Sequence, residues 1–196
     1  MVMGKGRLEA FSDGVLAIII TIMVLELKVP HGDNWAALQP MVPIFLAYVM
    51  SFVYVGIYWN NHHHLLHATT KTSGAVLWAN LLLLFWLSLF PVTTTWLGEH
   101  PSAPAPTLLY GVVLLMAALS YYLLEQCIVH ADGEQSHLKR ALGNDLKGKI
   151  SPIAYTIGIA LSYVAPHLAQ LMYVLVALMW LIPDRRIERD LNHHTE

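Results

Sequence analysis

Six apolar stretches constrain this chain more than any other feature of its sequence. A helix that crosses the hydrocarbon core of a bilayer needs about 20 predominantly apolar residues. Six segments reach or approach this length: residues 8–27, 38–59, 75–97, 107–129, 150–164 and 168–182. The last two are short and lie close together in the sequence, so they indicate a tight helical hairpin. The expected fold class is therefore an all-α membrane protein with six transmembrane helices per subunit.

The composition supports a membrane protein and excludes several other classes. Hydrophobic residues make up 56% of the chain and charged residues only 12%, whereas soluble proteins carry about 25% charged residues. The formal net charge of −2, without a basic patch, argues against a nucleic-acid partner. Cys127 is the single cysteine, so an intramolecular disulfide is excluded.

The positions of the basic residues predict how the chain is oriented in the membrane. With six spans, all of the eleven Lys and Arg residues except Lys28 fall on one side. Because loops rich in Lys and Arg remain in the cytoplasm, we expect both termini to be cytoplasmic. Residues 1–183 then form a single six-helix transmembrane domain, and residues 184–196 form a charged cytoplasmic tail.

The first apolar segment carries the most informative pattern of side chains. It opens with a polar head that contains Arg7, Ser12 and Asp13. At 100° per residue, four later residues share one side of a helix: Ile18, Thr21, Ile22 and Leu25. A face of aliphatic side chains beside one hydroxyl is compatible with the lining of a narrow pore. It is equally compatible with ordinary packing against another helix.

Polar residues in the second and third segments indicate hydrogen bonds between helices. Asn80 lies inside an apolar segment and needs a partner, because an unpaired amide in hydrocarbon is costly. The spacing of His63 and His67 suits a metal on a helix, but no local Glu or Cys completes a ligand set. A hydrogen-bonding role at the end of the second helix is therefore expected for the histidines that begin at His62, with no metal site.

Two acidic residues, Glu26 and Glu99, fall at the outer ends of spans, where they are compatible with enrichment of cations or with a solvated surface. Pro91 predicts a kink or a loosened helix in the third segment, with nearby threonines recapturing the freed carbonyl groups. No ionisable residue occupies the apolar middle of a span, which weakens a proton relay or an ion-coupled transporter. Hydrolase motifs and a carbonyl potassium filter are also missing.

Four groups of residues form a recognisable signature: Arg7-x-x-x-Phe11-Ser12-Asp13 continuing through Ala17-Ile18, Thr21 and Val24-Leu25; Tyr58-Trp59 with His62-His63; Leu77-Trp78-Ala79-Asn80-Leu81; and Phe90-Pro91 with Leu97-Gly98-Glu99. This signature resembles that of the transmembrane protein 175 family. The family comprises the endolysosomal potassium channels of animals and their prokaryotic relatives. The resemblance covers about the first half of the chain closely, and one six-helix unit per chain is similar to the prokaryotic form.

The resemblance implies a homotetramer in which the first helix of each subunit, about residues 8–27, lines a central cation pathway. Ile18 would form the narrowest ring, with Ile22 and Leu25 as further layers toward the outside. Thr21 would take the hydroxyl position tied to potassium preference. The implied network at the inner mouth consists of Arg7, Phe11, Ser12 and Asp13, with His62, His63 and Asn80 as candidate partners.

The implied function is a cation channel that weakly prefers potassium over sodium and is gated by dewetting of an aliphatic constriction. It would reside in the plasma membrane of a prokaryote and need no cofactor, metal or obligatory partner protein besides permeant potassium, the bilayer and its own copies. We expect no enzymatic activity. A secondary transporter remains an alternative, followed by a membrane metalloenzyme built on residues His62 to His67.

Overall fold

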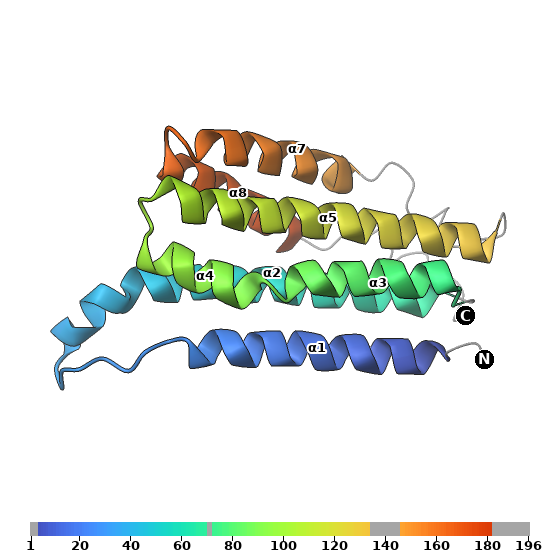
Figure 1. Ribbon diagram of the computed structural model, residues 1–196, viewed down its shortest axis with the longest axis horizontal. Helices are drawn as coiled ribbons and strands as arrows, with labels where there is room; N and C mark the ends of the chain where they lie inside the picture. The colour runs from blue at the N-terminus through green and yellow to red at the C-terminus, as the bar shows by residue number, and fades with distance from the viewer. Residues whose placement is uncertain (1–3, 70–71, 134–145, 182–196) are drawn as a thin grey trace.

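The computed structural model describes residues 4–69, 72–133 and 146–181, and helices dominate all three ranges. The helices are α1 (Lys5–Leu25), the 3-10 helix η1 (Trp35–Met41), α2 (Val42–Ala68), α3 (Gly74–Leu87), α4 (Phe90–Glu99), α5 (Pro104–Asp132), α7 (Leu146–Leu161) and α8 (Pro166–Leu181). They lie side by side, and the chain direction reverses from one long element to the next (Figure 1). The expected all-α class is therefore confirmed.

Four stretches of helix are long and apolar enough to cross a bilayer: Lys5–Leu25, Trp35–His67, Gly74–Glu99 and Pro104–Asp132. Helices α7 and α8 contain 16 residues each. At 1.5 Å per residue each is about 24 Å long, which is less than the roughly 30 Å hydrocarbon core. Within the described ranges, four of the six expected spans thus have full transmembrane length.

The helix of the second segment extends beyond its apolar part. The apolar segment was expected over residues 38–59, and α2 continues to Ala68. None of the residues from Asn60 to His67 is a glycine or proline, so the helix runs through this mainly polar stretch without a break. The histidines therefore stand on the last turns of α2.

The third segment is interrupted at Ser88 and Leu89, which separate α3 from α4. Pro91 accounts for the break, because its ring collides with the carbonyl group four residues earlier, that of Leu87. The hydroxyl of Thr93 donates to the carbonyl oxygen of Leu89 at 3.0 Å, beside the backbone N–H of Thr93, which donates to the same oxygen. The kink predicted at Pro91 is thus present as a break between two helices.

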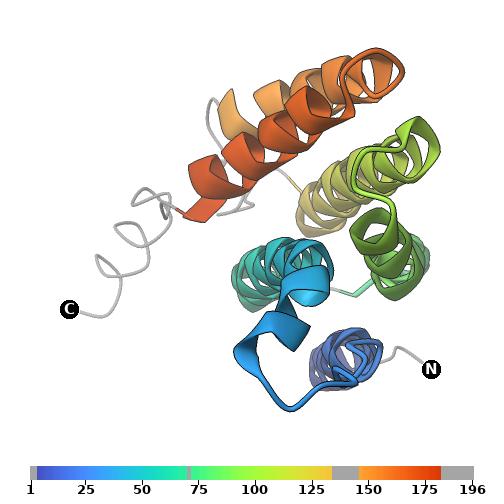
Figure 2. The same cartoon turned by 90° about the vertical axis from the view of Figure 1, so that its left-hand side faces the viewer.

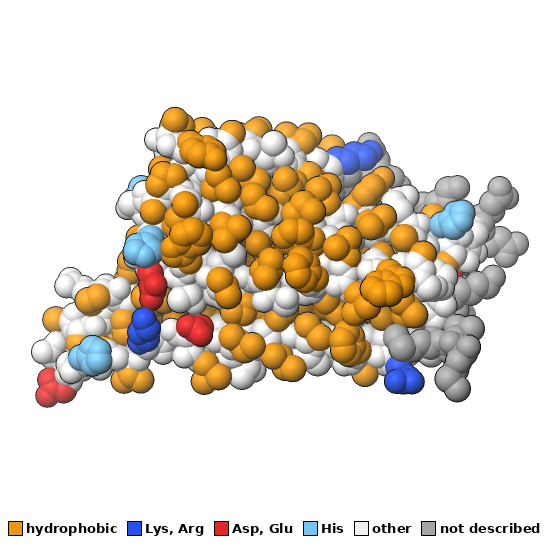
Figure 3. Space-filling model, viewed as in Figure 1, with side chains coloured by type: hydrophobic (Ala, Val, Ile, Leu, Met, Phe, Trp, Pro, Cys, Tyr) orange, Lys and Arg blue, Asp and Glu red, His pale blue; other side chains and the backbone are white. Residues whose placement is uncertain are grey.

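Charged side chains gather near the two ends of the bundle, and a broad hydrophobic band lies between them on the face drawn in Figure 3. Lys5 and Arg7 lie at the start of α1, and Lys147 and Lys149 at the start of α7. Both helices begin at the same end, here called the inner end (Figure 1). Lys28 follows the opposite end of α1, at the outer end. The tail, residues 184–196, lies outside the described residues.

Helix α1 stands at the edge of the bundle, beside α2 and the α3–α4 pair, whereas α7 and α8 form the opposite edge (Figure 2). One face of α1 is buried against these neighbours: Leu8, Ser12, Leu16, Ile19 and Met23. These positions recur every three or four residues, as expected of one helical stripe. Helix α5 lies between the α3–α4 pair and the α7–α8 pair and contacts all four helices.

Small residues allow the closest approach of helices in the half of the bundle around α5. A Cβ atom added at Gly158 of α7 or at Gly111 of α5 would overlap the ring of Tyr173, which is itself fully buried in α8. The hydroxyl of Tyr54 donates to the carbonyl oxygen of Tyr173 at 2.5 Å. Tyr173 thus joins α2, α5, α7 and α8 where the two glycines leave room for its ring.

Candidate functional site

The aliphatic residues singled out in the first segment lie on the side of α1 that faces away from the bundle. Ile18 is 59% exposed, Ile22 43% and Leu25 76%. On the opposite side of the same helix, Leu16 and Ile19 are almost fully buried. The subunit therefore leaves uncovered the face that we expected to line a pore.

The exposed side of α1 forms a continuous stripe along the whole helix: Arg7, Phe11, Gly14, Ile18, Thr21 and Leu25. Successive members are separated by four and three residues in alternation, which is the spacing of one helical face. No other part of the described chain comes within 4 Å of the position that a Cβ atom of Gly14 would occupy. The stripe is open for contact with something other than its own subunit.

Thr21 is the single hydroxyl-bearing residue on this stripe. Its hydroxyl donates to the carbonyl oxygen of Ala17, one turn earlier in α1, at 2.8 Å. This bond uses the hydroxyl hydrogen and leaves the lone pairs of the oxygen available. The Thr21 oxygen can therefore accept a hydrogen bond from water or face a cation without leaving its helix.

A buried chain of hydrogen bonds ties α1 to α2 and α3 near the inner end. The side chains of Ser12, His62 and Asn80 are at most 2% exposed. The Asn80 amide donates to the Ser12 hydroxyl at 3.0 Å, and the Ser12 hydroxyl donates to the Leu8 carbonyl at 2.9 Å. Nε2 of His62 lies 2.7 Å from Oδ1 of Asn80.

The directions of these bonds determine which ring nitrogen of His62 carries a hydrogen. Because the Asn80 amide group donates to Ser12, its Oδ1 atom is the acceptor that faces His62. Nε2 of His62 must then be the donor. The direction from donor to acceptor is the same in all three bonds, from His62 through Asn80 and Ser12 to the backbone of α1. In such a chain each hydrogen bond polarises the next one.

A second set of contacts joins the exposed edges of α1 and α2. Asp13 accepts a hydrogen bond from the indole of Trp59 at 3.1 Å. Nδ1 of His63 lies 3.2 Å from a carboxylate oxygen of Glu9. One turn nearer the N-terminus, the ammonium group of Lys5 donates to the carbonyl oxygen of His67 at 2.7 Å. The residues that make these three contacts are four apart on each helix. The three edge contacts therefore hold the inner half of α1 in register with α2.

The structure brings together only part of the network expected at the inner mouth. Ser12, His62 and Asn80 are connected by hydrogen bonds, whereas Asp13 and His63 take part in the edge contacts between α1 and α2. Arg7 and Phe11 lie on the exposed stripe instead, and among the described residues the Arg7 side chain has no hydrogen bond or ion pair.

The two acidic residues expected at the outer end differ in their surroundings. Glu99 accepts a hydrogen bond from the ammonium group of Lys28 at 3.1 Å, and this pair links the loop after α1 to the end of α4. Glu26 is exposed directly after α1. Since the Lys28–Glu99 pair is exposed, it contributes at most about 1 kcal/mol to stability.

Within the described ranges, no three His, Cys, Asp or Glu side chains are grouped as metal ligands would be. The rings of His63 and His67 lie 6.1 Å apart and are stacked. The two histidines are thus one helical turn apart, and their rings contact each other.

One buried ionisable residue was missed by the sequence reasoning. Glu125, in the inner part of α5, is only 5% exposed. Glu125 lies near the end of its segment, outside the apolar middle of the span in which an ionisable residue was expected to mark a functional site. A signal was present, because a lone acid flanked by Tyr121, Tyr122 and Leu124 on a helix is an unusual place for a solvated charge.

Comparison with known proteins agrees with the resemblance noted from the motifs. The profile of the family described as "Endosomal/lysosomal potassium channel TMEM175" matches residues 7–91. A protein of Chryseobacterium sp. (strain P1-3) named a potassium channel is 58% identical over 192 residues, which cover 98% of this chain and all of the relative. A protein of Streptomyces collinus that is also named a potassium channel is 30% identical over 187 residues. This alignment covers 90% of this chain and 91% of the relative.

The fold is shared with a solved channel. The crystal structure of a lysosomal potassium-selective channel TMEM175 homolog from Chamaesiphon minutus superposes with a TM-score of 0.79. The superposition covers 91% of this chain and 96% of that chain, at 29% identity. The similarity therefore extends well beyond the half of the chain that carries the motifs, and the chain belongs to the TMEM175 family of ion channels.

Proposed function

We propose that the chain is one subunit of a potassium-conducting channel in a prokaryotic plasma membrane, with the exposed face of α1 lining the pore. The observation that carries this proposal is the uncovered aliphatic stripe on α1. An apolar stripe on an edge helix has to be covered by lipid or by other copies of the chain. The relatives that bear the name potassium channel favour the second alternative.

Four copies arranged around a common axis would bring four α1 stripes together. The alternation of four- and three-residue intervals supports such an arrangement, because helices that pack around an axis present residues at this spacing. In the proposed homotetramer both termini of each chain are cytoplasmic, and all six apolar segments cross the bilayer. The shorter helices α7 and α8 would lie at the periphery.

Ile18 would then form the narrowest ring of the pore, followed toward the outer end by Ile22 and Leu25. The column from Ile18 to Leu25 is about 10 Å long at 1.5 Å per residue. A ring of aliphatic side chains excludes water when it is narrow, so it can act as a hydrophobic gate. The smaller dehydration cost of potassium relative to sodium, together with the Thr21 oxygen atoms, would supply the weak preference for potassium.

The contacts of the inner half of α1 have a supporting role in this proposal. Ser12, through Asn80 and His62, fixes the buried face of α1 against α3 and α2. The edge contacts Asp13–Trp59 and Glu9–His63 hold the side of α1 against α2. Arg7 and Phe11 stand on the stripe itself, so they would meet neighbouring subunits at the inner mouth, and Glu26 and Glu99 would lie around the outer mouth.

The test is potassium and sodium flux through the purified protein in liposomes, compared with the Ile18→Asn variant. An amide in the constriction retains water, so we expect a higher flux and a lower preference for potassium. The flux rises about tenfold for each 1.4 kcal/mol by which hydration lowers the barrier.

Ile157→Asn provides a matched control, because Ile157 is 46% exposed on α7, at the far edge of the bundle from α1. This variant should conduct as the unchanged protein does. If Ile18→Asn and Ile157→Asn behave alike, Ile18 does not form the constriction. Single-channel currents distinguish a channel from a transporter, because a transporter turns over too slowly to produce them.

A further inference from the structure

A long groove runs between α2, from Pro43 to Val53, and α8, from His167 to Leu181, and no residue of α1 lines it. The volume of this α2–α8 groove is about 620 Å³. A protein cavity that holds benzene measures about 150 Å³. Van der Waals contacts are lost wherever close-packed side chains face empty space. A groove of this size therefore calls for an occupant from outside the subunit.

The lining of the α2–α8 groove is apolar except at one end. The polar side chains among the described lining residues are His167 and Gln170, both on the first turns of α8. The buried alanines Ala47 and Ala177 contribute only a methyl group each, which leaves room between the two helices. A bound water molecule needs two to four polar partners, so water does not suit the apolar part. The occupant is therefore an apolar group with a polar end.

The polar end of the groove lies at the outer end of the bundle. A Cβ atom added at Gly98 would lie 2.7 Å from the Cα atom of Ile44, so the start of α2 stands beside the end of α4. The next residue of α4, Glu99, pairs with Lys28. Charged side chains at the ends of membrane helices lie at the border between hydrocarbon and water. The groove thus opens at the depth of the lipid head groups.

The length of the groove matches one leaflet of a bilayer. From Pro43 to Val53, α2 rises about 15 Å at 1.5 Å per residue, which is half of the roughly 30 Å hydrocarbon core. Figure 1 shows that α8 begins at the outer end and stops about halfway along α2. A lipid chain of one leaflet occupies the same depth. A transmembrane helix of another copy would cross the entire core, so it does not match a groove that ends in the middle.

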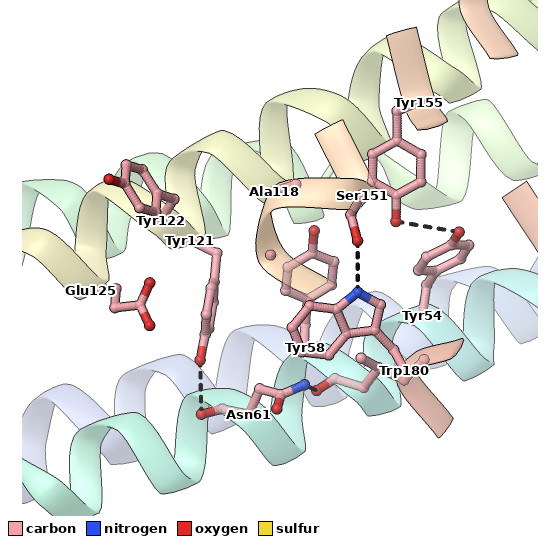
Figure 4. Close-up of a pocket in the computed structure, with 12 residues that line it drawn as sticks. Tyr54, Tyr58, Asn61, Ala118, Tyr121, Tyr122, Glu125, Ser151, Tyr155 and Trp180 are labelled. Atoms are coloured by element: carbon pink, nitrogen blue, oxygen red, sulfur yellow. Dashed lines mark hydrogen bonds between the residues drawn. The ribbon is translucent and has the colours of Figure 1, made fainter. Parts of the chain in front are cut away.

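Hydrogen bonds outside the groove fix the position of α8. The indole N–H of Trp180 donates to the hydroxyl of Ser151 in α7 at 2.8 Å (Figure 4). The hydroxyl of Tyr54 donates to the carbonyl oxygen of Tyr173 and ties α8 to α2. None of these four residues lines the groove. Because α8 is held from its other side, the groove is a fixed feature of the subunit.

We propose that the α2–α8 groove binds one acyl chain of a phospholipid from the leaflet at the outer end of the bundle. The chain would lie along Val49, Val53 and Leu178, with the head group at the level of His167 and Gln170. Among the described lining residues there is no Lys, Arg, Asp or Glu, so the groove recognises the chain and not a charge on the head group. Since the groove lies within one subunit, the proposal is independent of the path that potassium takes.

The experiment is titration of the purified full-length protein in detergent micelles with phosphatidylcholine, followed by native mass spectrometry. We expect one phospholipid per chain to bind before weaker uptake begins. Lysophosphatidylcholine has the same head group and a single chain, so it should compete for the site. Glycerophosphocholine has the head group without a chain and should not compete. The proposal is overturned if binding does not saturate at one lipid per chain, or if either competitor behaves in the opposite way.

Val174→Trp places a large ring in the groove and should weaken phosphatidylcholine binding at least about tenfold. Leu175→Trp is the matched control, because Leu175 is the next residue of α8 and is 55% exposed, yet it does not line the groove. This control should bind phosphatidylcholine as the unchanged protein does. Equal affinities of the two variants would show that the lipid does not occupy the groove.

A second pair of variants on α2 serves if Val174→Trp does not fold. Leu46 is 60% exposed and lines the groove, whereas its neighbour Phe45 is 53% exposed and does not. Leu46→Trp should weaken binding as Val174→Trp does, and Phe45→Trp should not. The same variants distinguish the lipid from a second copy of the chain. If the groove variants lower the mass of the assembly in light scattering and leave the number of bound lipids per chain unchanged, the groove is a subunit contact and the proposal is wrong.

Discussion

The buried hydrogen-bond chain on α1 makes a quantitative prediction for Asn80→Leu. Leucine retains a branched side chain of similar length, so the substitution removes hydrogen bonds without opening a large cavity. Two bonds are lost, those to Ser12 and to His62. Hydrogen bonds between helices in membrane proteins contribute about 0.6 kcal/mol on average and up to about 1.7 kcal/mol. The expected loss of stability is therefore about 1–3 kcal/mol.

His62 determines whether the loss falls in the upper part of this range. After the substitution the Ser12 hydroxyl still donates to the Leu8 carbonyl, so Ser12 keeps one partner. Nε2 of His62 has no other hydrogen bond to a described residue, and the side chain is 2% exposed. A buried donor that loses its partner costs about 1–3 kcal/mol. We therefore expect His62, rather than Ser12, to account for most of the effect.

The assay is reversible unfolding of the purified protein in mixed micelles, followed by tryptophan fluorescence. Ser12→Ala should lose less than Asn80→Leu, because it breaks the bond to Asn80 and leaves the His62–Asn80 bond intact. In a double-mutant cycle the two substitutions should couple by about 0.6–1.7 kcal/mol, the value of the bond they share. Ser88→Ala, at an exposed hydroxyl that donates to the carbonyl oxygen of Phe85 three residues earlier, is the control and should be close to neutral. A loss below about 0.3 kcal/mol for Asn80→Leu would refute the reasoning.

Two further predictions concern packing and assembly. Gly158→Ala should destabilise the protein by about 1–3 kcal/mol in the same unfolding assay, because the new methyl group meets the buried Tyr173 ring. Gly14→Ala is its control, since open space surrounds Gly14 within the subunit, and an equal loss in both variants would contradict this explanation. Asp13→Ala removes the acceptor of the Trp59 indole on the helix proposed to line the pore. It should reduce the yield of tetramer in size-exclusion chromatography with light scattering more than it changes flux per tetramer, and a normal tetramer yield would exclude the role of Asp13 in assembly.

The extent of the helices could be predicted from the sequence only where apolar length alone decides it. The first helix was expected over residues 8–27 and is observed over Lys5–Leu25. The second apolar segment ends at residue 59, whereas α2 continues to Ala68. A helix needs no apolar side chains to continue, and neither glycine nor proline interrupts residues 60–67.

The two faces of α1 show why the candidate site needed more than periodicity. Ile18 and Ile19 are adjacent residues of the same type, yet one is 59% exposed and the other 3%. Aliphatic side chains suit a core, a bilayer and a hydrophobic pore alike, so composition does not distinguish the three surroundings. Only the motif around Ser12 and Asp13 linked one face to a pore before the packing of α1 was known.

Polar contacts between distant segments were predictable in kind but not in pairing. Asn80 was expected to find a partner, and His62 and Ser12 were among the candidates. Which of them it meets depends on the register of three helices, and one turn changes that register by 5.4 Å. Glu125 was missed for a related reason. Its burial depends on how the neighbouring helices pack around α5, which the sequence leaves open.

The spacing of the exposed stripe on α1 has a consequence for the shape of the proposed pore. The five intervals between Arg7 and Leu25 span 18 residues and average 3.6, which is the number of residues per turn of a straight α-helix. Leu25 therefore lies directly above Arg7 on the surface of the helix. Straight α1 helices can thus keep the entire stripe on the axis of the proposed pore, whereas a left-handed supercoil needs a sustained average of 3.5. The diameter of the aliphatic rings is then set by how far the α1 helices stand from the axis and by how much they tilt.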